Sequence, residues 1–143
     1  MEIRVMTAAD YARVYALWQA TPGMGLDPDD DTPEAIARYL QRNPGCSFVA
    51  EAGGKLAGGI LAGHDGRRGY LYHAAVLPEY RGQGIGRALV ERAMEALQRE
   101  GIHKVGLYAY TENRIGNDFW EHLGFRVRED LSYRNKFVRD HVK

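Results

Sequence analysis

The sequence lacks several features that would point to particular classes of protein. Its 143 residues include a single cysteine, Cys46, so neither an internal disulfide nor a cysteine pair for a zinc site can form. No apolar run approaches the roughly 18 residues that cross a bilayer, and the first residues lack the apolar stretch of a signal peptide. We therefore expect a cytoplasmic protein without a membrane partner.

The chain also lacks an excess of either charge, because 19 Lys and Arg residues balance 19 Asp and Glu residues. Proteins that bind duplex nucleic acid usually carry a basic excess, since they displace counterions from the phosphates. The balance argues against nucleic acid as the main partner. The length is typical of one domain, so we predict a single domain over residues 1–143.

The chain is rich in glycine, with 17 residues, and in regular apolar patterns. Alternating polar and apolar residues predict strands at residues 2–6, 47–52, 55–63, 69–77, 103–110, 125–129 and 132–138. Apolar residues repeated every three or four positions predict helices after Thr7 and Thr32 and over residues 85–100 and 114–123. This order predicts an α/β protein with a mixed sheet of about seven strands and helices on both faces.

The strongest chemical signal is a glycine turn between the strand at 69–77 and the helix at 85–100, with the sequence RGQGIG over residues 81–86. Glycines let a ligand approach the backbone, and successive amides at a helix N-terminus attract an anion. The pattern predicts a pyrophosphate site; the alternative is a tight turn that needs glycine only for its backbone angles. A Walker A loop is excluded because Arg87 and Ala88 follow Gly86. A Rossmann fingerprint is excluded because Arg87 stands three positions after Gly84.

Three motifs together resemble the GCN5-related N-acetyltransferase (GNAT) family. Arg81, Gly84 and Gly86 fill its Q/R-x-x-G-x-G/A motif, and residues 74–78 resemble its L-A-V-x-P strand end. Residues 113–125 resemble its N-x-x-A-x-x-x-Y-E-x-x-G-F segment, so the likeness covers essentially the whole chain. The resemblance implies the GNAT acyl-CoA N-acyltransferase fold. It also implies direct transfer of an acetyl group from acetyl-CoA to a primary amine, without an acyl-enzyme or a metal.

The resemblance further implies where acetyl-CoA binds. The amides of the glycine turn would hold the pyrophosphate, and the preceding strand would pair with the pantetheine arm in a gap between the strands at 69–77 and 103–110. Asn113 would contact that arm, and Trp120 would form a wall against it. The expected contacts are Ala74, Ala75, Val76, Arg81, Gly82, Gln83, Gly84, Ile85, Gly86, Arg87, Asn113 and Trp120.

The proton-transfer residues depart from the family's habits. Trp120 stands where many relatives have an acidic tyrosine, and its indole N–H cannot give up a proton near neutral pH. Tyr70 and Tyr108 occupy strand positions where some relatives carry a glutamate. Three alternatives stay open: a tyrosine relays protons, with Tyr108 first; His73 acts as a base; or the cleft only orients a neutral amine. The tyrosines concerned are Tyr70, Tyr72, Tyr108 and Tyr110.

The acceptor is the least determined part of the prediction. Four aspartates at positions 27, 29, 30 and 31 lie between the first two helices, where they would favour a cationic amine at the entrance. The alternative is a solvated acidic loop. We predict an N-acetyltransferase for a small-molecule or peptide amine, as a monomer or homodimer; the competing hypothesis is a CoA-binding module that has lost catalysis.

Overall fold

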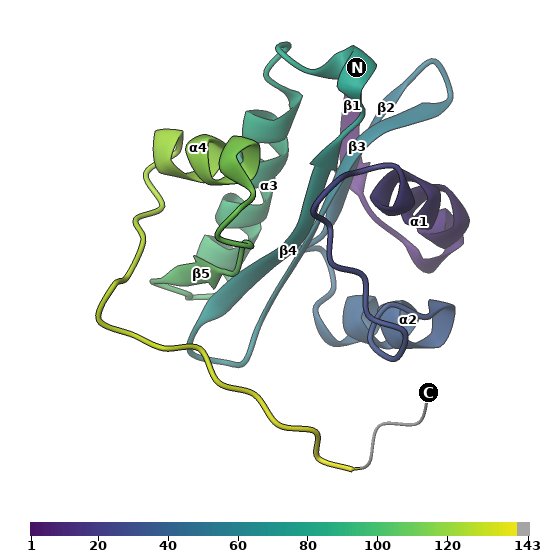
Figure 1. Cartoon of the computed structure of the whole chain (residues 1–143). Coiled ribbons are helices and arrows are strands. Elements are labelled where there is room, and N and C mark those ends of the chain that lie inside the picture. The colour runs from purple at the N-terminus through teal and green to yellow at the C-terminus, as the bar shows by residue number, and fades with distance from the viewer. Residues whose placement is uncertain (140–143) are drawn as a thin grey trace.

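The computed structural model describes residues 1–139, which form one mixed sheet covered by helices on both faces (Figure 1). The strands are β1 (Glu2–Val5), β2 (Phe48–Ala52), β3 (Lys55–His64), β4 (Gly69–Val76) and β5 (Val105–Leu107). They lie in sequence order, with β1 to β4 antiparallel and β5 parallel to β4. The hairpins follow from tight turns, whereas the parallel pair needs the helical crossover between β4 and β5.

Two helices cover each face of the sheet (Figure 1). On one face lie α1 (Tyr11–Gln19) and α2 (Pro33–Arg42), and on the other lie α3 (Ile85–Arg99) and α4 (Arg114–His122). Short 3₁₀ helices, η1 (Ala8–Asp10) and η2 (Pro78–Tyr80), precede α1 and the glycine turn. The predicted cap at Thr32 is confirmed, because its hydroxyl accepts a hydrogen bond from the Ala35 amide at 3.1 Å.

The sheet separates two hydrophobic cores. Side chains of a strand point alternately to its two faces, so each strand contributes to both cores. The core under α3 includes Phe48, Ile60, Leu71, Leu89, Ala93 and Leu97. The core under α1 and α2 includes Val14, Leu17, Trp18, Val49, Leu61 and Ala75. Residues 56–63 of β3 are buried on both faces, so this strand forms the centre of the sheet.

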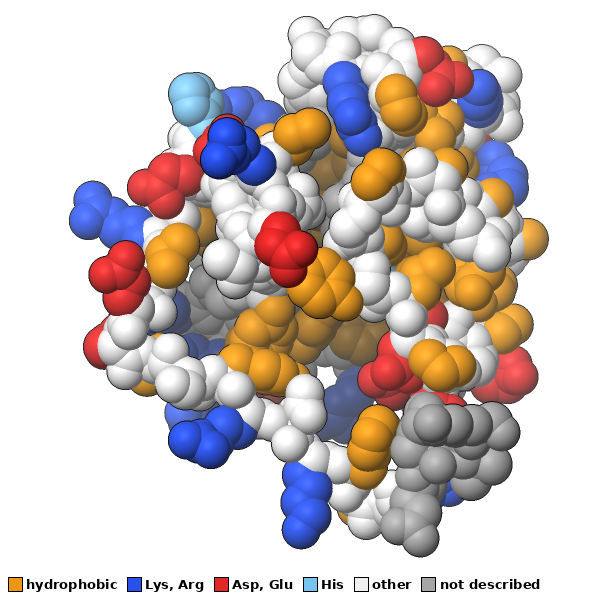
Figure 2. Space-filling model, in the orientation of Figure 1, with side chains coloured by type: hydrophobic (Ala, Val, Ile, Leu, Met, Phe, Trp, Pro, Cys, Tyr) orange, Lys and Arg blue, Asp and Glu red, His pale blue; other side chains and the backbone are white. Residues whose placement is uncertain are grey.

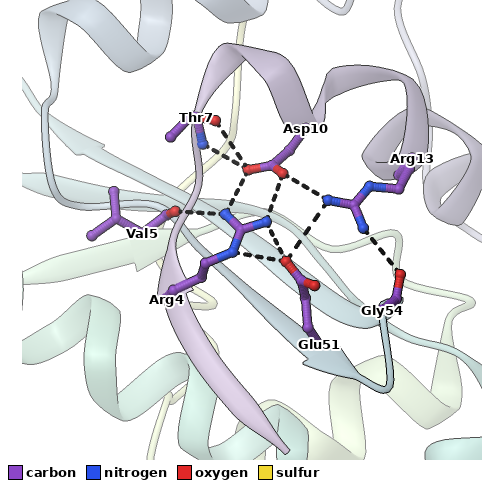
Figure 3. A network of polar contacts seen from close by, with 7 residues as sticks. All are labelled: Arg4, Val5, Thr7, Asp10, Arg13, Glu51 and Gly54. Carbon is purple, nitrogen blue, oxygen red and sulfur yellow. Dashed lines mark hydrogen bonds and ion pairs between the residues drawn. The ribbon is translucent and has the colours of Figure 1, made fainter.

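A network of charges around the buried Asp10 joins β1, η1, α1 and β2 (Figure 3). Arg4 donates to both carboxylate oxygens of Asp10, at 2.9 and 2.8 Å, and its Nε donates to Glu51 at 2.8 Å. Arg13 adds a contact to Asp10 at 3.1 Å. The hydrogen bonds from Arg4 are the main reason that the pKa of Asp10 falls to about 2. This network ties the start of the chain to the sheet.

The prediction of about seven strands is wrong, since the sheet of the described residues has five. The strand expected at 103–110 is only three residues long, and residues 125–139 form neither helix nor strand. Figure 1 shows this last segment leaving the body of the molecule. Its apolar side chains are mostly exposed, as for Val127, Tyr133 and Phe137. Alternation describes how side chains are distributed, whereas a strand also needs a hydrogen-bonded neighbour, which this segment lacks.

Candidate active site

The two parallel strands diverge halfway along β4. Their pairing runs from Gly69 opposite Val105 to Leu71 opposite Leu107 and then stops. From there to Val76, β4 pairs with β3 on one side and, among residues 1–139, with no strand on the other. A β-bulge lies where they separate, because two residues, His73 and Ala74, oppose Ile60 of β3. A bulge bends and twists its strand, which accounts for the divergence.

The free edge of β4 includes the segment expected to pair with pantetheine. Ala74, Ala75 and Val76 all lie beyond the last β5 pairing. The Arg81 side chain crosses back to this edge, and its Nε donates to the Val76 carbonyl at 3.3 Å. Backbone amides and carbonyls at such an edge offer hydrogen bonds to an extended ligand carrying amide groups of its own.

The glycine turn lies immediately after this edge, at the N-terminus of α3. Gly82 and Gly84 have left-handed backbone angles, with φ of 78° and 81°, and a Cβ on either would point into open space. None of the six amides from Gly82 to Arg87 donates a hydrogen bond within the described part of the chain. A helix N-terminus carries about half a positive charge. The turn therefore offers free donors and a favourable field to an anion.

The other residues of the glycine turn differ in whether their side chains pack inside the protein or face solvent. Ile85 is 5% exposed and packs into the core, so only its backbone faces the turn. Gly86 also has a packing role, because a Cβ there would lie 3.1 Å from the Phe119 ring. Gln83 and Arg87 are exposed, and Arg87 lies 3.9 Å from Glu91 on the same helix.

Asn113 and Trp120 have structural partners that the sequence did not reveal. The Asn113 side chain caps α4 by accepting from the Gly116 amide at 3.0 Å, and it lies against Gly23 of the loop after α1. Trp120 stands edge-on to Phe119 and Phe125, at centroid distances of 4.9 and 5.3 Å. Both residues help to place α4 over the N-terminal half of α3.

A cleft opens beside the N-terminus of α4. Its volume is about 610 Å³, and its lining residues are Pro22, Gly23, Tyr110, Glu112, Asn113, Arg114 and Ile115. Figure 2 shows a hollow near the middle of this face of the molecule, with hydrophobic side chains on its floor. The cleft is therefore bounded by the loop after α1 and by the segment that leads from β5 into α4.

A row of tyrosines follows the divergence of β4 and β5. The Tyr70 and Tyr108 rings stack at 6.0 Å with planes 13° apart, and Tyr72 and Tyr133 extend the row at 6.4 and 4.6 Å. Tyr108 is 56% exposed, just after the end of β5. Partial burial, then the neighbouring tyrosines, raises the pKa of Tyr108, so its phenol stays protonated near neutral pH. Tyr110 turns instead toward Gly25, and sequence reasoning did not find Tyr133 in the row.

His73 is paired with an acid of the loop between α1 and α2. Its Nε2 lies 2.8 Å from Oδ1 of Asp31, which is 6% exposed. The second oxygen of Asp31 accepts from the Asp27 amide at 2.8 Å, and the Tyr11 hydroxyl donates to the Asp31 carbonyl. Burial raises the pKa of the Asp31 carboxyl, but the hydrogen bonds from His73 and Asp27 outweigh it, and the pKa lies below its ordinary value. The partners are 42 positions apart in the sequence, so sequence reasoning did not find this contact.

Within residues 1–139, no three His, Cys, Asp or Glu side chains are grouped so that they could hold a metal ion. No helix in the same part of the chain is long and apolar enough to cross a membrane.

Comparison with known proteins gives the family. The model of the acetyltransferase (GNAT) family matches residues 11–125, which include the free edge of β4, the glycine turn and α4. This chain belongs to the GNAT acetyltransferase family. A curated relative, acetyltransferase SG1711 of Sodalis glossinidius (strain morsitans), is 34% identical over 131 residues, which are 92% of this chain and 91% of the relative.

Solved structures agree with this acetyltransferase fold. Ard1 from Thermoplasma volcanium is similar with a TM-score of 0.78 and 21% identity, over 89% of this chain and 83% of that one. The PaiA N-acetyltransferase from Thermoplasma acidophilum, solved in complex with coenzyme A, is similar with a TM-score of 0.77 and 21% identity, over 89% of this chain and 90% of that one. The family and the mixed α/β fold predicted from the sequence are confirmed.

Proposed function

We propose that this GNAT acetyltransferase moves the acetyl group of acetyl-CoA directly to a primary amine. The proposal rests on two features that follow each other closely in the chain: a free strand edge over residues 72–76 and six free amides from Gly82 to Arg87. The first suits the two amides of a pantetheine arm, and the second suits a pyrophosphate. The thioester would then lie where β4 and β5 separate.

The transfer needs two proton movements. The amine nitrogen attacks the thioester carbonyl, so a C–N bond forms, the C–S bond breaks and the sulfur leaves as a thiolate. The nitrogen gives up one proton, and the thiolate takes one up. Tyr108, neutral and beside the divergence, is the proposed donor toward sulfur, with Tyr70 stacked against it.

Direct transfer is supported by the state of the lone cysteine. Cys46 is 2% exposed, and burial is the main cause that raises the pKa of its thiol. A buried neutral thiol is a poor nucleophile, because the thiolate is the reactive form. The chain's one thiol is therefore unsuited to carry an acyl group, which supports attack on the thioester by the amine itself.

The proposed acceptor is an amine of a small molecule or a peptide. Similar structures include an aminoglycoside N-acetyltransferase, AAC(6')-Iy, and the ribosomal-protein-S18-alanine N-acetyltransferase of Escherichia coli. Their names span both kinds of amine. In this chain the loop after α1 contains four aspartates and no lysine or arginine, which favours an acceptor with positive charge.

A thiol-release assay tests the proposal. The protein is incubated with acetyl-CoA and a panel of small amines and peptides, while free CoA thiol and the mass of each amine are followed. We expect thiol release that depends on an amine, with one acetyl group gained by that amine. The Cys46→Ala variant should keep the wild-type kcat. Tight CoA binding with no acetylation of any amine would support the CoA-binding module instead.

A further inference from the structure

His73 occupies an unusual position in the backbone. Among the described residues it is the only one other than glycine with a positive φ, at 51°. Left-handed angles are costly for a residue with a Cβ, and such residues collect at functional sites. His73 stands two residues beyond the last β4–β5 pair, in the bulge that opens the gap. The bulge thus holds an imidazole beside the expected thioester.

The partner of His73 fixes which nitrogen carries the proton. A carboxylate can only accept hydrogen bonds, so the contact between Nε2 and Asp31 places a proton on Nε2. Nδ1 of the neutral imidazole then has a free lone pair. It makes no hydrogen bond within residues 1–139, and it is not among the buried side-chain atoms that lack a partner. Nδ1 is therefore open to solvent or to a ligand.

The surroundings of the pair hold it in one arrangement. The Trp18 ring of α1 stands edge-on to the imidazole at 4.7 Å, and its own indole N–H is buried and has no hydrogen-bond partner among residues 1–139. Asp31 is held by the Asp27 amide and by Tyr11. The same loop carries three further aspartates and no lysine or arginine. The ring contact and these hydrogen bonds therefore hold the imidazole and the carboxylate against each other.

We propose that Asp31 and His73 form the general-base pair of the acetyl transfer, an inference that rests on the proposed function. His73 takes a proton from the acceptor amine through Nδ1 as the C–N bond forms, and becomes an imidazolium. Asp31 is the positioning residue: it selects the tautomer, orients the ring and stabilises the imidazolium. The proton returns to solvent after CoA leaves. The carboxylate that positions the base thus comes from the loop between α1 and α2 rather than from β4 or β5.

Two variants distinguish a catalytic role of the pair from a role in holding the loop against the bulge. Asn tolerates left-handed angles, so His73→Asn keeps the backbone of the bulge while the base is lost, and its shorter side chain gives up the contact that Nε2 makes with Asp31. Asp31→Asn removes the charge but keeps the shape. Asp65→Asn removes an aspartate charge in the exposed turn between β3 and β4, and its amide oxygen can still accept from the Arg67 and Arg68 amides, so it serves as the control. All are compared by melting temperature, by CoA affinity and by kcat/KM for the acceptor from pH 5.5 to 9.5.

We expect His73→Asn and Asp31→Asn each to lower kcat/KM at pH 7 by roughly 10²–10⁴-fold, the usual effect of general bases. CoA affinity should stay close to wild type, and the loss should shrink at high pH as the amine loses its proton unaided. The double variant should be no worse than the single ones, and Asp65→Asn should stay within threefold of wild type. Full activity in His73→Asn, or an equal loss at every pH, would overturn the base assignment.

A spectroscopic measurement tests the positioning role without turnover. Long-range ¹H–¹⁵N correlation of the imidazole should show the tautomer protonated on Nε2 in the wild type, and a mixture of tautomers in Asp31→Asn. A wild type that binds CoA but acetylates no amine would contradict the proposed function, and the tautomer would still report on the pair. An Nδ1-protonated wild type would overturn the pair even if the enzyme is active.

Discussion

Replacing Gly84 by Asp tests whether the glycine turn binds the pyrophosphate of CoA. The position is the N-cap of α3, and a Cβ there would meet nothing within 4 Å. An Asp side chain would therefore extend into the space that we assign to the pyrophosphate, and it would bring a negative charge. The fold should survive, since the turn is exposed and the substitution displaces no core residue.

The expected loss can be worked out from Coulomb's law. Two unit charges about 6 Å apart repel by about 0.7 kcal/mol in water and by about 3 kcal/mol at the effective dielectric constant of a protein surface. Because about 1.4 kcal/mol corresponds to a tenfold change in affinity, these two energies correspond to losses of affinity of about 3-fold and about 100-fold. A pyrophosphate carries more than one charge, so we expect CoA to bind at least about tenfold more weakly.

Calorimetric titration with CoA measures this loss, and two other variants isolate its cause. Gly84→Asn has nearly the same shape and backbone strain without the charge, so it should bind CoA much more tightly than Gly84→Asp. The ratio between them should shrink with added salt, because salt screens exposed charges. Gly45→Asp, at another open left-handed glycine, shows the cost of strain away from the site. If Gly84→Asp folds and binds CoA like the wild type, the pyrophosphate assignment is refuted.

Three further predictions concern the chemistry and the stability of the fold. Tyr108→Phe should lower kcat by roughly 10²–10⁴-fold if Tyr108 protonates the thiolate, whereas Trp120→Phe, a change within an aromatic cluster, should stay within a few-fold; steady-state kinetics compare the two, and full activity in Tyr108→Phe would remove its role. Asp10→Asn should reduce the free energy of unfolding by about 2 kcal/mol at pH 7, because the pKa of Asp10 is lowered from 3.8 to about 2 in the folded state. This contribution is present above pH 4 and is lost as the pH falls toward 2, so urea unfolding of the two proteins should converge there; a difference that persists at low pH would contradict the linkage. Gly86→Leu should lower the melting temperature and displace α4, because Phe119 already fills the space beside Gly86; an unchanged melting temperature would contradict this packing role.

Local sequence signals predicted most of the helices and strands. The glycines at 53 and 54 have the left-handed angles of a two-residue hairpin turn, and Thr32 caps α2 as its hydroxyl and the following proline indicate. The glycine turn was found because close approach of a backbone requires glycine at particular positions. In each case the cause lies within a few residues, so the pattern carries the information.

The parts that were missed depend on partners that are distant in the sequence. Alternation at residues 125–138 could not show that these residues lack a neighbouring strand. The contact of Asp31 with His73 joins a loop to a bulge, and the bulge itself arises from the register between β3 and β4. Asn113 was assigned to the cofactor, and its additional role as the cap of α4 appears only when the helix start is known.

Hydrogen exchange in the presence of acetyl-CoA tests the central claim most directly. The claim is that the co-substrate occupies the free edge of β4 and the amides of the glycine turn. Both sets of amides lack protein partners on the side where the ligand is placed, and both should therefore exchange quickly in the free protein. We predict that acetyl-CoA slows exchange in peptides covering residues 72–76 and 82–87, and leaves β1 and β2 unchanged. Binding that protects another region, with exchange at residues 72–76 and 82–87 unaltered, would contradict the account.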